Sequence, residues 1–185
     1  MDLDDAIRAR RSIREFSTKK PDWRLIIEAI DAARFAPTAG DNFTTKFLMV
    51  SDIEKISILA KATQQHFIGK VQYVVIVCSA PSRTINAYGE AGKAYVRQQA
   101  GAAIQNFLLK LTELGLGTCW VGYFSEEMIK EALKIPSDVQ VEALFPIGLV
   151  LDKKKRIKNS IDLDNILYFE EYGNKRMKKI NKLEV

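Results

Sequence analysis

The apolar positions along this chain alternate between helical and strand-like spacing, without internal repeats, low-complexity runs or an obvious linker. Apolar residues spaced three and four apart predict helices, and short continuous apolar runs predict buried strands. Helices are expected at about Asp2 to Arg11, from Pro21 and Asp22 to just before Pro37, through Ile53 to Ala60, at about Glu90 to Leu114, and from the cap Ser125 to Pro136. Strands are expected at Lys46–Ser51, Tyr73–Ala80, Thr118–Tyr123 and Val139–Leu151.

The predicted strands differ in their expected place in a sheet. Tyr73–Ala80 is apolar on both faces, which is typical of a central strand. Pro146 interrupts Val139–Leu151 and lacks the N–H that a sheet ladder uses, so it favours an edge or a bulge. Taken alone, the alternation of helices and strands favours a parallel sheet.

The longest predicted helix has unusually small side chains in its middle, from Gln99 to Asn106. Small residues allow another backbone to approach closely. Tight packing inside the domain explains them, and so does a helix–helix dimer seam in which Gln105 or Asn106 bonds across to a second copy. The sequence leaves both interpretations open.

Composition indicates one ordinary globular domain. The chain has 185 residues, 47% of them hydrophobic, enough to bury a full core. Cys78 and Cys119 lie in apolar runs with no C-x-x-C pair, so we expect buried free thiols and a reducing compartment. The first residues are acidic where a secretory signal would be basic, and no apolar run approaches the ~20 residues of a membrane span. We therefore expect a cytoplasmic protein that does not bind membranes.

The net charge of +5 does not indicate nucleic-acid binding. Much of the excess lies in two late segments, 153–158 and 175–182, and without them the body of the chain is close to neutral. A nucleic-acid groove would instead carry basic residues interleaved with aromatic ones. We interpret these segments as solvated surface, and a basic adaptor for acidic polymers is the lowest-ranked hypothesis.

The common catalytic signatures are absent from the sequence. His66 is the single histidine, which excludes two-histidine metal motifs, and we expect it to be a surface or packing residue. The run from Gly115 to Trp120 begins like a dinucleotide fingerprint but has Trp120 at the third glycine position and leads into a strand. There is no P-loop and no G-x-S-x-G elbow. This pattern favours a protein whose chemistry is carried by a bound cofactor.

A basic cluster near the N-terminus suits such a cofactor. Arg10, Arg11 and Arg14 place three guanidinium groups, with the hydroxyl of Ser12, within five residues. Guanidinium forks match phosphate oxygens, and a serine adds a donor of suitable reach. A continuing helix would put Arg10 and Arg14 on one face, whereas a helix that ends near Arg11 would leave the following residues extended. A solvated helix end explains the cluster about equally well.

Four motifs in this order resemble the FMN-dependent nitroreductase family. They are Arg10–Phe16, Ala36–Gly40, Gly101–Asn106 and Leu114–Gly122, followed by Ile147–Gly148 and a basic segment. The resemblance covers almost the whole chain.

The resemblance implies an α+β, three-layer fold with a mostly antiparallel central sheet flanked by helices. It also implies an intertwined homodimer with an FMN site at each of two subunit interfaces. Residues 1–173 would form a single FMN-binding domain, and the basic tail 174–185 would pack on the partner subunit.

The same resemblance assigns site residues. Arg10, Arg11 and Ser12 would contact the flavin phosphate or ribityl chain, and Arg14 would lie beside flavin N1 and O2. A fixed cation there would stabilise the reduced flavin. Pro37, Thr38 and Ala39 of the partner subunit would line the flavin. The backbone around Leu116 and Gly117 would also approach the ring, because glycine has no side chain to prevent close contact.

The chain departs from the family pattern in the segment Asp41 to Thr45 and in its late phosphate contact. Asp41 stands where the family has an asparagine that bonds the flavin N3 and O4 edge; a carboxylate can only accept, so Asn42 is expected to take over toward O4. The family also has a Lys-x-Arg pair near the end of the domain that contacts the phosphate. In this chain the pair is expected to be either Arg156 with Lys158 or Lys154 with Arg156. The usual Gln-Pro-Trp is also replaced by Phe43, Thr44 and Thr45.

The sequence therefore predicts an FMN-dependent NAD(P)H oxidoreductase. NADH or NADPH would reduce the flavin at N5 and leave before a nitroaromatic, quinone or similar electron-poor acceptor enters the same pocket. No side chain is expected to be catalytic, because the flavin carries the chemistry. The alternative is a flavin-binding or flavin-supplying protein with little turnover, suggested by the altered segment from Asp41 to Thr45.

Overall fold

The computed structural model describes residues 1–151 and 161–177 of the chain. Internal contacts divide the chain into two compact units, Met1–Lys155 and Arg156–Val185. The elements named below belong to the first unit unless stated otherwise. The expected single domain over 1–173 with a tail over 174–185 stays a prediction.

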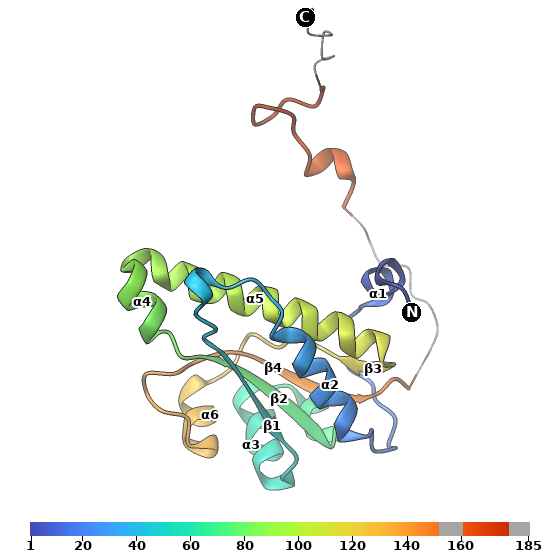
Figure 1. The fold of residues 1–185 in the computed structure, drawn as a ribbon. Coiled ribbons are helices and arrows are strands. Elements are labelled where there is room, and N and C mark those ends of the chain that lie inside the picture. Colours follow the sequence, from blue (N-terminus) through green and yellow to red (C-terminus); the bar gives the residue numbers. More distant parts are fainter. Residues whose placement is uncertain (152–160, 178–185) are drawn as a thin grey trace, which may run out of the picture. The chain divides into compact units, whose positions relative to one another are not determined.

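Among the residues that the structure describes, four strands form one antiparallel sheet in the order β1-β2-β4-β3 (Figure 1). The strands are β1 (Thr45–Val50), β2 (Tyr73–Ser79), β3 (Leu116–Thr118) and β4 (Gln140–Leu149). Every residue of β2 is buried, which confirms the prediction of a central strand. The antiparallel direction agrees with the family resemblance, and the parallel sheet favoured by alternation alone is wrong.

Helices cover both faces of the sheet. Alternate residues of a strand point to opposite faces, and on β2 Val75 and Val77 pack against α2 (Trp23–Ala33) and α5 (Glu90–Glu113). Val74 and Ile76 pack on the other face against α3 (Ile53–Thr63) and α6 (Glu126–Leu133). The result is the three-layer α+β architecture that was predicted (Figure 1).

The remaining helices are short. They are α1 (Leu3–Ala9), α4 (Ser82–Tyr88), and the 3₁₀ turns η1 (Ala39–Asp41) and η2 (His66–Lys70). The first helix is shorter than the predicted Asp2 to Arg11, because Arg10 already has extended backbone angles. Ser125 precedes α6 as predicted, but its side chain makes no capping hydrogen bond. His66 is exposed, as expected.

Pro146 occupies neither an edge strand nor a bulge, because β4 has neighbours on both sides and the register shift lies beside Val77 and Cys78. Leu144 exchanges both backbone hydrogen bonds with Val121, so the nitrogen of Pro146, two residues on, faces the same side. There the ladder is interrupted between the end of β3 at Thr118 and Val121. This gap removes the need for a donor at Pro146. The predicted strand Thr118–Tyr123 is therefore mostly wrong: only Thr118 belongs to β3, which begins at Leu116, and Val121 forms an isolated bridge with Leu144.

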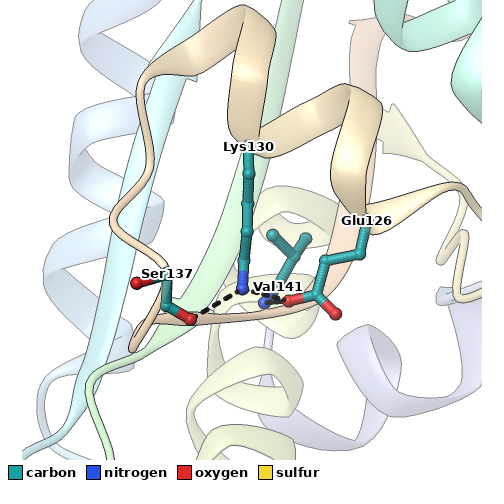
Figure 2. A network of polar contacts seen from close by, with 4 residues as sticks. All are labelled: Glu126, Lys130, Ser137 and Val141. Atoms are coloured by element: carbon teal, nitrogen blue, oxygen red, sulfur yellow. Dashed lines mark hydrogen bonds and ion pairs between the residues drawn. The ribbon is translucent and has the colours of Figure 1, made fainter.

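A hydrogen bond from the β4 backbone to Glu126, which also forms an ion pair within α6, connects α6 to the start of β4 (Figure 2). Glu126 accepts from the backbone N–H of Val141 at 3.1 Å and pairs with Lys130 at 2.9 Å, and Lys130 also donates to the Ser137 carbonyl at 3.2 Å. Partial burial disfavours the carboxylate of Glu126, but the bonds from Lys130 and Val141 outweigh burial and lower its pKa. The charged form of Glu126 therefore stabilises this corner.

In the second unit, η3 (Leu163–Asn165) precedes a turn in which the Phe169 N–H donates to the Asn174 carbonyl at 2.9 Å. The Tyr168 and Tyr172 rings lie 4.8 Å apart, and the Lys175 ammonium lies 4.1 Å from the Tyr168 ring centre.

Candidate functional site

The residues from Arg10 to Phe16, which we call the basic segment, follow α1. This segment is extended and lies against the β3–β4 side of the sheet. Ser12 forms a parallel bridge with Thr118, and the Ile13 N–H donates to the Thr118 carbonyl at 2.8 Å. Further on, Phe16 forms an antiparallel bridge with Val150. The structure thus selects the extended alternative, in which Arg10 and Arg14 do not share a helix face.

Two glycines make room for this segment. A Cβ on Gly117 would lie 3.0 Å from a methyl carbon of Ile13, and a Cβ on Gly148 would lie 2.8 Å from the Phe16 ring. Internal packing therefore already accounts for Gly117, which is buried, as is Leu116. Contact of this backbone with a flavin stays a prediction.

The side chains of Ser12 and Arg14 are exposed on the surface of this segment. In an extended segment, Ser12 and Arg14 project on the side opposite to Ile13. Both are exposed, and Arg10 is half-buried. Within the part of the chain that the structure describes, Arg10 and Arg14 form no ion pair. The side-chain hydroxyl of Thr118 is buried and has no hydrogen-bond partner among the described residues.

The second predicted group, Pro37 to Asn42, forms a turn beside α5. Thr38 precedes η1, and Gly40 and Asp41 both have a φ of 56°, in the left-handed region. Glycine adopts this conformation freely, and aspartate is among the residues that tolerate it best. A Cβ on Gly40 would lie 2.5 Å from the Tyr88 hydroxyl oxygen. Both the backbone conformation and the contact with Tyr88 therefore restrict which residues can occupy this turn.

Asp41 and Asn42 line an open cleft of about 400 Å³. Lys46 from β1 and Arg83 from α4 also line it, so two cations stand beside one carboxylate. Asp41 is exposed and Asn42 half-buried. The structure thus places this departure from the family pattern on an accessible surface.

One chain does not bring the two predicted groups together. The Ala39 N–H bonds to Gln99 in the first half of α5, whereas the basic segment joins β3, which follows the end of α5 (Figure 1). At a rise of 1.5 Å per residue, Gln99 and Glu113 are separated by roughly 20 Å along the helix axis. Arg156 and Lys158, with Lys154, lie outside the described residues.

The small side chains of α5 serve mostly internal packing. Ala100 and Ala103 are buried in the domain, and Asn106 donates to the Ala32 carbonyl of α2 at 3.4 Å. Gln105 is exposed, and a Cβ on Gly101 would meet no atom within 4 Å. A dimer seam at Gly101 and Gln105 stays a prediction.

Gln99 is the contact residue that sequence reasoning missed. Its side chain is buried and bonds to both Ala39 and Thr44. The signal was its position in the sequence: Gln99 falls on the stripe that carries the buried residues Val96, Ala103 and Phe107. A polar residue on a buried stripe requires a partner.

The described residues give little support for a metal site or a reactive thiol. No group of three or more His, Cys, Asp or Glu side chains among them could hold a metal ion. Both cysteines are buried and free, as predicted. Burial, with help from Glu142 and Glu126, raises the pKa of Cys78 to about 11, so this thiol is a poor nucleophile near neutral pH. No described helix is both long and apolar enough to cross a membrane.

Comparisons with known proteins agree with this arrangement. The profile of the Nitroreductase family matches residues 7–72 and 57–149. A Methanothermobacter thermautotrophicus protein, provisionally named an NADH dehydrogenase/NAD(P)H nitroreductase, is 31% identical over 156 residues, covering 80% of this chain and 77% of that protein. The crystal structure of a nitroreductase family protein from Clostridium novyi superposes with a TM-score of 0.76 at 28% identity, covering 94% of this chain and 96% of that one. An FMN-dependent nitroreductase from Clostridium difficile shares the fold, with a TM-score of 0.77 at 24% identity over 91% of this chain and 99% of its own.

Proposed function

Because this chain belongs to the nitroreductase family, we propose that it is an FMN-dependent oxidoreductase. NADH or NADPH is the proposed electron donor. The proposed acceptors are nitroaromatics, quinones or similar electron-poor small molecules. The name of the relative from Methanothermobacter supports the nicotinamide donor, and the name of the Clostridium difficile protein supports FMN.

The observation that carries this proposal is the extended basic segment. Arg10, Ser12 and Arg14 offer two cations and a hydroxyl, and neither arginine is neutralised by an ion pair within the described residues. Phosphate and the polar edge of a flavin need donors of this kind. The buried hydroxyl of Thr118, the residue paired with Ser12, has no hydrogen-bond partner among the described residues and adds a further polar group at the same place. The residues present therefore fit FMN.

In this proposal, Arg10, Arg11 and Ser12 hold the phosphate and ribityl chain, and Arg14 lies at the N1 and O2 edge. When bound, FMN supplies hydride transfer at N5, first from the nucleotide and then to the acceptor in the same pocket. Arg14 contributes a fixed positive charge that favours the reduced, negatively charged cofactor. No side chain of this chain is required as an acid or base.

We further propose that the complete site needs two copies of the chain. Pro37, Thr38, Ala39, Asp41 and Asn42 are separated from the basic segment along α5, so a second copy would bring its own turn to the first copy's cluster. The backbone around Leu116 and Gly117 would then face the flavin from the same chain as Arg14. This homodimer, with a small-molecule acceptor as its other partner, is testable by mixing variants.

The direct test of function is steady-state kinetics of the FMN-loaded protein with menadione or nitrofurazone as acceptor. Shared occupancy of one pocket predicts parallel lines in double-reciprocal plots when both substrates are varied. Intersecting lines would contradict the ping-pong scheme. Absence of turnover with either donor would contradict the reductase itself.

The dimer has its own test. Arg10→Ala homodimers and Gly40→Val homodimers would each bind FMN more weakly, for a different reason. Subunit exchange between them would create hybrids that have one wild-type site and one doubly altered site. Recovery of FMN binding on mixing, with no recovery in either parent, would support a site shared between subunits.

The second candidate function is a flavin-binding or flavin-supplying protein with little turnover. Asp41 favours it, because this carboxylate stands on the accessible turn where the family has an amide. Retained flavin that neither nucleotide reduces would favour this function.

A further inference from the structure

One buried amide connects the turn at Ala39 to the end of the sheet. Gln99 is 6% exposed and extends from α5. Its Oε1 accepts from the Ala39 N–H at 3.4 Å, and its Nε2 donates to the hydroxyl of Thr44. Both functional atoms of this side chain therefore bond to the same loop, at its two ends.

The loop has only a few other connections to the body of the domain. The Thr44 carbonyl accepts from the Ala80 N–H at 2.9 Å, which fixes the end of the loop next to β1. Within the loop, the Asn42 N–H bonds to the Ala39 carbonyl at 3.1 Å and closes the turn. Tyr88 packs over Gly40. Gln99 thus supplies the hydrogen bond between the Ala39 end of the loop and α5.

The amide is not needed for packing. Its neighbours on the buried stripe of α5, including Ala100 and Ala103, are apolar, and a methionine would fill a similar volume. Burying an amide is unfavourable unless its hydrogen bonds are made. Here they are made to the loop and not within α5, so the amide specifies where the loop lies.

We propose that Gln99 is a positioning residue that holds the loop Ala39–Thr44 in the conformation that completes the cofactor site. This inference rests on the proposed function, because it takes Ala39, Asp41 and Asn42 to face FMN. Gln99 itself would not touch the cofactor.

Three variants test the proposal. Gln99→Met keeps the volume and removes both hydrogen bonds. Gln99→Glu keeps an acceptor for the Ala39 N–H and can accept from the Thr44 hydroxyl, so it should restore much of the function. Thr63→Val is the matched control, since Thr63 is also fully buried and its hydroxyl donates to the Leu59 carbonyl at 2.9 Å, in α3.

The readouts are the melting temperature, the FMN dissociation constant and hydrogen–deuterium exchange of peptides covering 39–44. Gln99→Met should raise the FMN dissociation constant roughly tenfold, the equivalent of one to two buried hydrogen bonds, and should speed exchange in the loop. Thr63→Val should lower the melting temperature without changing FMN affinity.

The outcomes separate this inference from the proposed function. If the wild type binds FMN and Gln99→Met binds it equally well, Gln99 is not a positioning residue. Unchanged exchange at 39–44 in Gln99→Met would overturn the inference whether or not FMN binds. If the wild type does not bind FMN, the proposed function fails, and the cofactor role of Gln99 fails with it.

Discussion

The segment from Ser12 to Phe16 is held to the sheet by main-chain bridges and by packing over two glycines, whereas the loop from Ala39 to Thr44 is held to α5 by one side chain. Main-chain bonds do not depend on which side chains the segment carries. The exposed side chains of Ser12 and Arg14 are therefore not needed to hold the segment on the sheet. In the loop, by contrast, the hydrogen bonds to α5 come from the side chain of Gln99, so we expect a single substitution at a residue that does not itself touch the cofactor to move the Ala39 end of the loop.

The largest expected effect is on ligand binding by the basic segment. Arg10→Ala should weaken FMN binding by roughly 10- to 100-fold, the value of a hydrogen bond to a charged group. Stability should stay within about 0.5 kcal/mol, because the main-chain bridges remain. Arg8→Ala, at an exposed cation on α1, is the control for net charge. Equal FMN affinity in both variants would move the phosphate site elsewhere.

A glycine substitution tests whether packing holds this segment in place. Gly148→Ala should cost about 1–3 kcal/mol by overpacking, because its Cβ would meet the Phe16 ring at 2.8 Å. FMN affinity should fall as well, since Phe16 and the arginines belong to one segment. Chemical denaturation and an FMN titration measure the two effects. A variant as stable as the wild type would show that the segment can move away from residue 148 at little cost, so that packing does not hold it in place.

Gly101→Ala is the matched substitution on α5. A Cβ there meets no atom within 4 Å in one chain, so the better helix propensity of alanine should stabilise the protein by up to ~1 kcal/mol. If Gly101 lies in a dimer seam, the same change should instead weaken association. Sedimentation equilibrium of this variant and the wild type decides between these results.

Much of the fold followed from the sequence because its signal is local. The apolar run at Tyr73–Ala80 identified the buried central strand, and the caps and prolines around α2 bounded that helix closely. Strand direction was not local. It depends on pairings between distant segments, such as Tyr73 with Ile147, and only the family resemblance predicted it. Pro146 was misplaced for the same reason, because the gap opposite it lies in another strand.

The candidate site was predictable in its charged part only. Arg10, Ser12 and Arg14 show their chemistry directly in the sequence, and the structure pairs Ser12 with Thr118 and packs Ile13 over Gly117. The proposed role of Gln99 depends on the loop Ala39–Thr44 that packs against α5. The spacing of residues along one helix cannot show which loop packs there. The contribution of Pro37 to Asn42 to a flavin site stays a prediction, and it requires a second copy of the chain.

A smaller effect is expected for the charge at Arg14. Arg14→Ala should lower the two-electron potential of bound flavin by about 30 mV, the equivalent of about 1.4 kcal/mol, because a cation near the reduced cofactor is lost. Arg14→Lys should recover part of the shift. Spectroelectrochemical titration of the three proteins measures it. An unchanged potential in Arg14→Ala would contradict the assigned role.

The smallest effect lies away from both halves of the site, at Glu126. Glu126→Gln removes an ion pair that is partly exposed, so about 0.5 kcal/mol of stability should be lost at neutral pH. The pKa of Glu126 is lowered in the folded protein, so its contribution is present above the ordinary carboxyl pKa and is lost as the pH falls through the folded value. Urea unfolding at pH 7 and near pH 3 should show the difference shrinking in acid. FMN affinity should not change.

The most direct test is the visible spectrum of the purified protein, loaded with FMN, desalted and titrated with NADH and then NADPH in the absence of oxygen. We predict that flavin stays bound through desalting and that at least one nucleotide bleaches its absorption. Flavin that is lost on desalting, or that stays oxidised with both nucleotides, would contradict the proposed reductase.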